Sequence, residues 1–255
     1  MSGWEESVYD DEFYGSQQDG SYDSAKIIMK YLSGKLPITS IVDIGCGRGG
    51  WLKAGQENGA TRIVGYDGPW VDSKKLLSSQ IEFKTQKLDE EFKIEGQFDL
   101  AICLEVAEHL EEGRGLNLVK NLCSCADVIL FGAAVKGQGG NHHINERLQS
   151  YWAKAFKSNG FKYLDVIRPK FWGNADVVWW YKQNSLLYIQ ENRYEKIKEG
   201  FDQLDWGQSP PIDLVHPDCL AEKAKRFSQY EGIINKPTIR FSLGSLKMAI
   251  KNLFS

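Results

Sequence analysis

The chain has 255 residues and a formal net charge of -3, with 31 Lys and Arg mixed among 34 Asp and Glu. This length suits one α/β domain with additions, and the mixed charges argue against a surface that follows the phosphates of a nucleic acid. The odd number of cysteines, five, is typical of a reduced, cytoplasmic protein. No signal-like leader opens the sequence and no apolar run approaches the ~20 residues that span a bilayer, so we expect a soluble protein.

Residues 1–36 combine acidic and aromatic side chains with a short helical pattern. Five aromatic residues lie among Asp and Glu in the first 24 positions, which is unlike a solvated tail. A helix is expected from Asp23 to Leu32. We predict that this segment is an arm and helix that cover a pocket, with a mobile arm as the alternative.

The chain then alternates strand and helix patterns, as in a parallel sheet with helices on both faces. The expected helices are near 48–58, 72–78, 110–124 and 146–159. The expected strands are near 39–44, 62–66, 81–84, 98–104, 127–133, 161–167 and 176–190.

A glycine-rich turn follows the first strand. Gly45, Gly47 and Gly50 fit the pattern G-x-G-x-x-G, in which glycine lets the backbone approach a ligand closely. Alone, this pattern suggests a nicotinamide dinucleotide at a helix amino terminus. Asp43, at the end of the strand, disfavours a pyrophosphate there and favours a cationic ligand.

The stretch V-D-I-G-C-G-R-G at residues 42–49 resembles the first motif of class I S-adenosylmethionine (SAM) dependent methyltransferases. The resemblance implies a Rossmann-like α/β domain over residues 37–190. Its seven-stranded, mostly parallel sheet would end in an antiparallel hairpin. In that family the glycine turn and the acid surround the methionine end of SAM, which carries an ammonium and a sulfonium group.

Two further acids fit the cofactor positions of this family. Asp67 ends the second strand about 20 residues beyond the glycine turn, where a carboxylate accepts the ribose hydroxyl protons; an ordinary turn aspartate is the alternative. Asp89 follows the third strand, where relatives contact the adenine amine. The cofactor residues expected from the resemblance are Asp43, Gly45, Cys46, Gly47, Asp67, Gly68, Leu88, Asp89 and Glu105.

The fourth strand runs into the sequence Glu105-Val106-Ala107-Glu108-His109, which resembles a motif of ubiquinone-type and small-molecule O-methyltransferases. If the segment is helical, Glu105, Glu108 and His109 share one face. Three interpretations remain open. These residues hold a divalent cation such as Mg²⁺, they support the pocket and catalysis, or the glutamates complement a helix dipole. A cation is possible but not favoured, and Glu105 and His109 are candidate catalytic residues.

A glycine-rich loop after the fifth strand carries two of the four histidines. Methyl transfer requires an acceptor oxygen to lose its proton as it attacks, and histidine can take that proton near neutral pH. His143 is the first candidate for this base and His142 the second. The alternative is that both only close the loop.

Residues 137–190 resemble a narrower group, the sugar O-methyltransferases of bacterial capsule and O-antigen biosynthesis clusters. The resemblance lies in the order and spacing of G-G-x-x-H-x-N-E and of the later aromatic pairs. It implies substrate contacts from Asn145, Glu146, Arg168 and Trp180. Core packing of the tryptophan, and Asn145 as a helix N-cap, are the alternatives.

Residues 191–255 are expected to form a C-terminal helical extension, ending in an amphipathic basic helix over 243–254. That helix would touch a membrane or partner, or pack on its own domain or on a twin subunit in a homodimer. The predicted function is SAM-dependent O-methylation of a sugar or phosphorylated metabolite, with S-adenosylhomocysteine as product and a histidine as base. A nicotinamide oxidoreductase and a non-catalytic SAM-fold binding protein are the alternatives.

Overall fold

The computed structural model describes residues 11–201 and 211–235 together with residues 239, 242 and 246–248. Side chains are described from residue 20 onward, except that of Ile234. The chain divides into two compact units, Met1–Leu214 and Val215–Ser255. The first unit therefore includes part of the extension that was expected to begin at residue 191. The arm over residues 1–10 and most of the basic helix over 243–254 lie outside the described residues.

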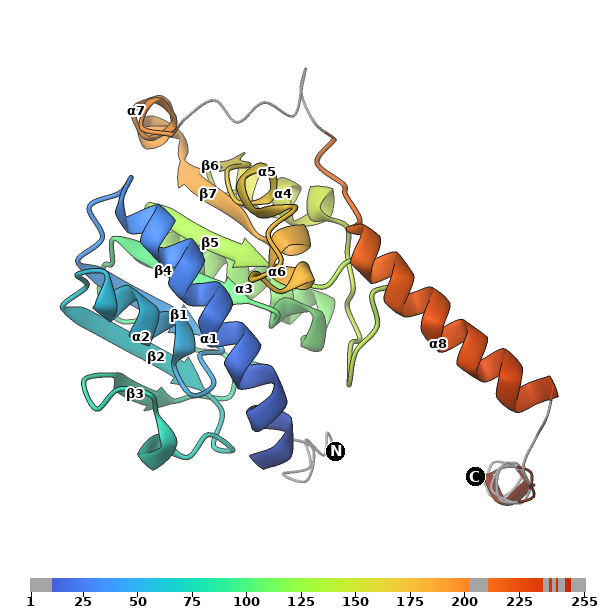
Figure 1. Ribbon diagram of the computed structural model, residues 1–255. Coiled ribbons are helices and arrows are strands. Elements are labelled where there is room, and N and C mark those ends of the chain that lie inside the picture. Colours follow the sequence, from blue (N-terminus) through green and yellow to red (C-terminus); the bar gives the residue numbers. More distant parts are fainter. Residues whose placement is uncertain (1–10, 202–210, 236–238, 240–241, 243–245, 249–255) are drawn as a thin grey trace. The chain divides into compact units, whose positions relative to one another are not determined.

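The first unit contains the predicted seven-stranded sheet (Figure 1). The strand order is β3-β2-β1-β4-β5-β7-β6. All neighbours pair in parallel except β7, which is antiparallel to both β5 and β6. The fold class expected from the sequence is thus confirmed. The strands are β1 Ser40–Ile44, β2 Arg62–Asp67, β3 Glu82–Thr85, β4 Leu100–Leu104, β5 Val128–Gly132, β6 Phe161–Leu164 and β7 Leu186–Gln190.

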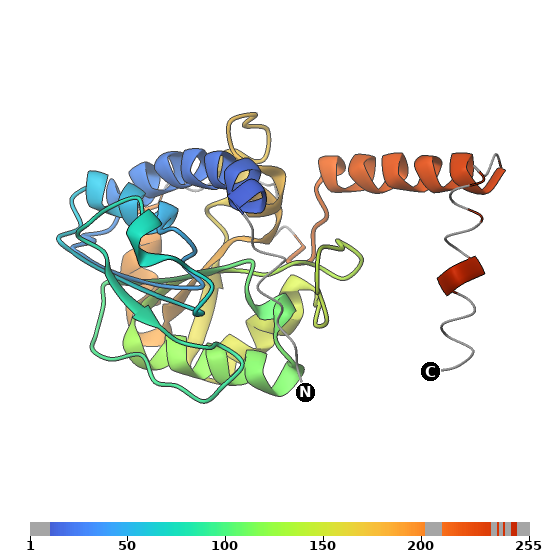
Figure 2. The same ribbon diagram turned by 90° about the horizontal axis from the view of Figure 1, so that it is seen from below.

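Helices cover both faces of this sheet (Figure 2). α1 and α2 lie on one face, and α3 and α4 lie on the other. The α-helices are α1 Asp11–Ser33, α2 Gly50–Glu57, α3 Glu112–Cys125, α4 Gln149–Lys157, α5 Arg168–Phe171, α6 Trp179–Asn184, α7 Tyr194–Glu199 and, in the second unit, α8 Pro217–Asn235. Short 3₁₀ helices span η2 Ser73–Lys75, η3 Ala107–His109 and η4 Glu191–Arg193. Within the described residues, no helix is both long and apolar enough to cross a membrane.

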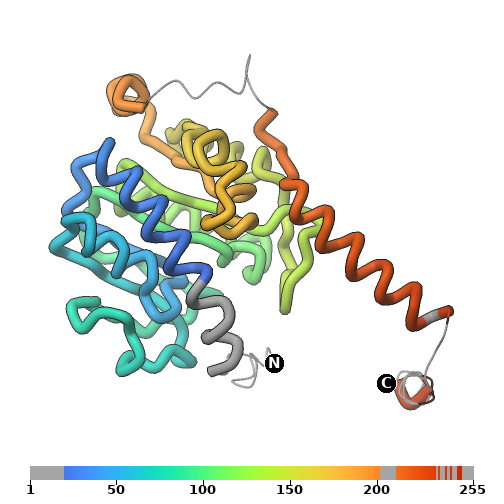
Figure 3. The backbone as a smooth tube through the Cα atoms, viewed as in Figure 1, coloured from blue at the N-terminus to red at the C-terminus, as the bar shows by residue number. Residues whose placement is uncertain are grey.

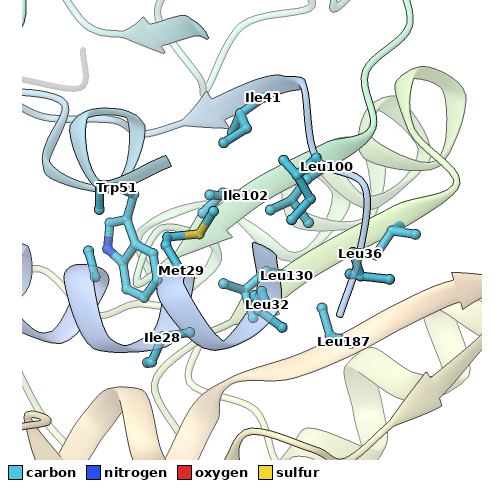
Figure 4. Close-up of a cluster of buried hydrophobic side chains, with 14 of the residues drawn as sticks. Ile28, Met29, Leu32, Leu36, Ile41, Trp51, Leu100, Ile102, Leu130 and Leu187 are labelled. Carbon is cyan, nitrogen blue, oxygen red and sulfur yellow. The ribbon is translucent and has the colours of Figure 1, made fainter. Parts of the chain in front are cut away.

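Alternation along the strands produces two apolar layers. In β4, Leu100 and Ile102 face the layer beneath α1 and α2, whereas Ala101 and Cys103 face α3 and α4. Figure 4 shows the first layer, where Ile28, Met29 and Leu32 of α1 meet the sheet. Because the central strands are buried on both faces, their sequences are almost continuously apolar.

α1 is longer than the helix expected over 23–32, and it runs beside α2 (Figures 1 and 3). It precedes β1 by a short connection and runs against the direction of that strand. Its amino-terminal half therefore lies toward the carboxyl edge of the sheet (Figure 1), the edge where open α/β sheets bind ligands.

The strand expected over 176–190 is wrong in its first half, because residues 179–184 form α6 and only 186–190 are extended. Tyr181 packs edge-on against Trp51 of α2 at 5.2 Å, and its hydroxyl donates a hydrogen bond to Ser21 of α1. These contacts override the β propensity of the aromatic residues. The helix expected over 72–78 is also wrong, since only η2 forms there.

Candidate active site

The turn between β1 and α2 is tied to the end of β2. The backbone N–H groups of Gly45 and Cys46 both donate to the carbonyl of Tyr66, at 2.8 and 3.2 Å. Gly45 has φ 81°, and a Cβ there would lie 2.3 Å from Cγ2 of Val106. Glycine is therefore required at this position by both its backbone conformation and its contact. The turn packs directly on the segment that follows β4.

Asp67 holds this turn in place through hydrogen bonds to its backbone. Its carboxylate accepts the N–H of Gly47 and the N–H of Gly68, each at 2.7 Å, and it is buried. Burial raises the pKa of Asp67 in spite of these hydrogen bonds and one from the Trp70 indole. The predicted ribose ligand thus holds the cofactor turn in shape, and its oxygens retain lone pairs for hydroxyl donors.

Asp43 supplies a second buried carboxylate, which is 3% exposed. Its Oδ2 atom has no hydrogen-bond partner among the described residues. Burial, and then the charge of Asp67, raise the pKa of Asp43 well above its usual range. Such a group is costly to bury unless a cation or a donor meets it. The site is therefore suited to a positively charged ligand.

The remaining predicted cofactor residues lie around these two acids. Cys46 is buried, and its sulfur lies toward Gly65 and donates a hydrogen bond to the carbonyl of Gly47 at 3.5 Å. Leu88 is buried and Asp89 half-buried in the turn after β3. The N–H of Gln86 donates to the carbonyl of Asp67, which places that turn beside the predicted ribose ligand.

Glu105 follows β4 in a left-handed backbone conformation, with φ 57°. A non-glycine residue rarely adopts this conformation. Its carboxylate accepts hydrogen bonds from Asn184 at 2.8 Å and from Gln138 at 3.2 Å. Burial raises the pKa of Glu105 to about 7, although these hydrogen bonds oppose the shift.

The expectation that Glu105, Glu108 and His109 share one helical face is wrong. Only residues 107–109 are helical, as η3, because the backbone turns sharply at Glu105. Instead, Glu108, His109 and His143 place one potential ligand atom each within 4.8 Å of one another. The predicted cation group therefore changes, because His143 takes the place of Glu105.

The three members of this group differ in their surroundings. Both carboxylate oxygens of Glu108 are buried without a hydrogen-bond partner in the described structure, and so is Nδ1 of His109. Burial, followed by the neighbouring charge of Glu105, raises the pKa of Glu108. Burial and then His143 lower the pKa of His109 to about 4. With a pKa of about 4, His109 is neutral near pH 7 but only weakly basic, which suits a metal ligand better than a general base.

The histidine loop is fastened to η3 by its backbone. The N–H groups of Ile144 and Asn145 both donate to the carbonyl of Glu108 at 2.9 Å, and the Asn145 amide reaches the carbonyl of Ala107. Nδ1 of His143 lies 3.0 Å from the Glu146 carboxylate. Glu146 also accepts the N–H groups of Gly137 and Gly139.

These contacts give the two histidines different positions. His143 is largely covered, with 12% of its side chain exposed, and Glu146 fixes its ring. His142 is exposed, with φ 57°. Of the two candidate bases, His143 is the one whose ring is oriented by a carboxylate, as expected for a catalytic imidazole.

The predicted substrate residues do not come together. Glu146 orients His143, and Asn145 is buried between η3 and Arg147. Asn145 is not the N-cap of α4, whose preceding residue is Leu148. Arg168 is fully buried: it bonds Asp165 at 2.6 Å and the carbonyl of Ile212. Trp180 packs on the apolar layer beneath α1.

A buried amide cluster lies at the same edge and left little sign in the sequence. Oε1 of Gln138 accepts from the side chains of Gln183 at 2.9 Å and Asn184 at 3.1 Å. It also accepts from the N–H of Val135, and the Gln138 amide donates to Glu105. Gln138 links the histidine loop to the end of β4. Its only signal was one amide between two glycines.

Comparison with known proteins bears on the family and the fold of the chain. Residues 17–153, more than half of the chain, match the sequence family described as a methyltransferase domain. No curated protein sequence is significantly similar to the chain.

Three solved structures show the same fold at low identity. DesVI of Streptomyces venezuelae has a TM-score of 0.56 and 12% identity, and the match covers 74% of this chain and 100% of that one. A chain from the complex of the Haloferax volcanii Trm112 methyltransferase activator with a putative methyltransferase has a TM-score of 0.53 and 13% identity, and the match covers 72% of this chain and 96% of that one. Magnesium protoporphyrin IX methyltransferase of Synechocystis PCC 6803, with bound SAH, has a TM-score of 0.50 and 21% identity, and the match covers 69% of this chain and 87% of that one. These structures share the fold, and the family match over more than half of the chain shows that it belongs to the methyltransferase-domain family.

Proposed function

We propose that this methyltransferase uses SAM to methylate an oxygen of a sugar or of a phosphorylated small metabolite in capsule or surface-glycan assembly. The observation that carries the proposal is the pair of buried acids, Asp43 and Asp67, beside a glycine turn, with an oriented histidine at the same edge of the sheet. The two acids and the glycine turn recognise the cofactor, and the histidine removes the proton of the acceptor.

The cofactor fits the residues present. SAM supplies a methyl group on a sulfonium, next to a positively charged ammonium. The unpartnered Oδ2 of Asp43 provides the negative charge that such a ligand requires. Asp67 keeps acceptor capacity for ribose hydroxyls while holding Gly47 and Gly68. A dinucleotide would instead bring its pyrophosphate close to Asp43.

His143 acts as the general base in this proposal. Glu146 favours the tautomer with the proton on Nδ1, so Nε2 keeps the lone pair that accepts the hydroxyl proton. The backbone bonds to Glu108 hold the ring in place, and alignment of the acceptor oxygen with the methyl group supplies much of the remaining rate.

The acceptor class rests on the resemblance of residues 137–190 to glycan O-methyltransferases. Lys136, Asn141 and His142 leave exposed polar groups in the loop around His143, which suits hydroxyl or phosphate groups. Arg168 takes no part in this proposal, because its guanidinium is buried and bonded to Asp165 and to the carbonyl of Ile212.

The first test is calorimetric titration with SAM, S-adenosylhomocysteine and NADH in parallel. We expect binding of the two adenosyl ligands and none of NADH; binding of NADH alone would overturn the cofactor assignment. Transfer of labelled methyl from SAM to nucleotide sugars and sugar phosphates then tests the acceptor. His143→Ala should lower kcat about 10²- to 10⁴-fold without changing SAM affinity, whereas His142→Ala serves as the matched control.

A second candidate mechanism places a divalent cation at Glu108, His109 and His143. It is favoured by the unpartnered, buried oxygens of Glu108 and by the neutral ring of His109. Two imidazoles and a carboxylate are a common ligand set for first-row metals, and Glu146 would then orient His143 as a ligand. Chelation distinguishes the mechanisms: it leaves kcat unchanged if His143 is a base alone, and abolishes it reversibly if a cation is required.

A further inference from the structure

Helix α8 of the second unit carries large apolar side chains that are open to water. Leu220, Phe227 and Tyr230 are 60%, 65% and 63% exposed. Every described side chain from Ala224 to Asn235 is exposed. Because most of a helix's stability in proteins comes from packing an apolar face, a 19-residue helix in this state lacks its main source of stability.

Most of the large apolar residues of α8 follow a seven-residue spacing, with Ile233 beside it at position g. Leu220, Phe227 and Ile234 occur at intervals of seven, and Tyr230 comes three residues after Phe227. These are the a and d positions of a heptad, which place one narrow apolar stripe along a helix. The opposite side of the helix carries small and polar residues such as Ala221, Lys225 and Ser228. Such a stripe is typical of a helix that pairs with another helix.

The charges beside the stripe favour an identical partner in parallel orientation. With Phe227 at position a, Arg226 falls at g and Glu231 at e. In a parallel pair, residue g of one helix meets residue e of the next heptad on the other helix, so these opposite charges meet twice. In an antiparallel pair g faces g, which brings the two arginines together. We propose that α8 pairs in parallel with α8 of a second copy of this chain.

Two further residues are compatible with this pairing. Arg226 forms an ion pair with Glu222 one turn earlier, and its five donors leave others for Glu231 of a second copy. Lys223 occupies the remaining d position, where its aliphatic stem covers the stripe and its ammonium reaches water. The stripe spans only two heptads, so the interface belongs to the small, transient class below ~1,200 Å². We therefore expect a reversible dimer that dissociates on dilution.

Sedimentation velocity of the full chain over a wide concentration range tests the proposal. Wild-type protein should shift from monomer to dimer with concentration, and Phe227→Glu should abolish the shift. Ser228→Glu, on the opposite side of α8, is the matched control and should dimerise as wild type does. A wild-type monomer at all concentrations, or a dimer insensitive to Phe227→Glu, overturns the proposal. Helical circular dichroism of both variants checks that the fold is retained.

Charge reversal tests the parallel orientation. Arg226→Glu and Glu231→Arg should each weaken self-association, because each creates a like-charge pair across the dimer. A mixture of the two variants should form a heterodimer, since both cross-pairs then have opposite charge; failure of the mixture to associate overturns the parallel arrangement. A monomeric wild type that instead co-sediments with vesicles of phosphatidylcholine and phosphatidylglycerol would assign the stripe to a lipid surface.

Discussion

Asp43→Asn should stabilise the cofactor-free protein and weaken SAM binding at the same time. The wild-type carboxylate is 3% exposed, has an unpartnered Oδ2 and lies within the field of Asp67. The amide keeps the shape of the side chain but removes the buried charge. The substitution therefore distinguishes the effect of the buried charge on protein stability from its effect on SAM binding.

The size of both effects follows from the burial. The amide keeps a buried polar group and removes only the charge, whose extra cost is about 1.4 kcal/mol for each unit by which burial raises the pKa of Asp43. Above that pKa the free energy of unfolding should therefore rise by about 1–3 kcal/mol. For a domain of this size that corresponds to a melting temperature about 2–10 °C higher. A lost hydrogen bond between charged groups is worth about 1.5–3 kcal/mol, so SAM should bind about 10- to 100-fold more weakly.

The pH dependence has a defined sign. Folding raises the pKa of Asp43. The free energy of unfolding of wild type is therefore undiminished below the pKa of this group in the unfolded chain, and it falls as pH rises from there to the higher pKa of the folded state. The stability difference between Asp43→Asn and wild type should thus grow with pH. Calorimetric melting without ligand and titration with SAM measure the two effects.

Asp99→Asn is the matched control for this experiment. Burial opposes ionisation of Asp99, but hydrogen bonds from Thr39 and Ser40 outweigh it and lower its pKa. This variant should lower the melting temperature and leave SAM affinity unchanged. A lower melting temperature for Asp43→Asn, or wild-type affinity for SAM, would refute the assignment of Asp43 to a cationic ligand.

Three other predictions concern the catalytic edge. Glu146→Gln should lower kcat about 10- to 100-fold through loss of His143 orientation, with SAM affinity unchanged in titration; Glu112→Gln, on the exposed part of α3, should have no such effect. Glu105→Gln should flatten the fall in unfolding free energy between pH 4.5 and about 7, because the folded state raises the pKa of Glu105 to about 7; urea unfolding at several pH values measures it, and an unchanged slope contradicts the shift. The cation candidate predicts that Mn²⁺ raises the melting temperature of wild type but not of Glu108→Gln; equal responses would dismiss the site.

The sheet and the cofactor turn were predictable because their signals are local. β4 and β5 read as short apolar runs, and each strand end was marked by a polar residue or glycine. The position of Asp67 followed from its distance to the glycine turn along the chain. α6 was not predictable, because Tyr181 is held by Ser21, which lies 160 residues away in the sequence. No local pattern reports such a contact.

The site was predictable in its residue types but not in its partnerships. Glu146 was expected to bind substrate, whereas it holds His143 three residues away. Arg168 offered a cation suited to phosphate, yet it forms a buried ion pair with Asp165, three residues earlier in the sequence. Glu105 and Glu108 were expected on one face of a helix, but Glu105 has φ 57° and lies outside η3. Backbone conformation and intramolecular pairing decide these roles, and neither is encoded in residue type or spacing alone.

The segment from Glu105 to His109 connects the two halves of the site. On one side Val106 contacts Gly45 so closely that no Cβ fits between them. On the other side the carbonyl of Glu108 accepts two N–H groups of the histidine loop. We expect that a shift of the glycine turn on cofactor binding would be passed to Val106 and, through the carbonyl of Glu108, to the histidine loop. At Glu105 the backbone N–H donates to the carbonyl of Gly132 at the end of β5, and the carboxylate is held by Asn184 of α6 and by Gln138 of the histidine loop. The five residues from Glu105 to His109 thus connect the glycine turn to the histidine loop.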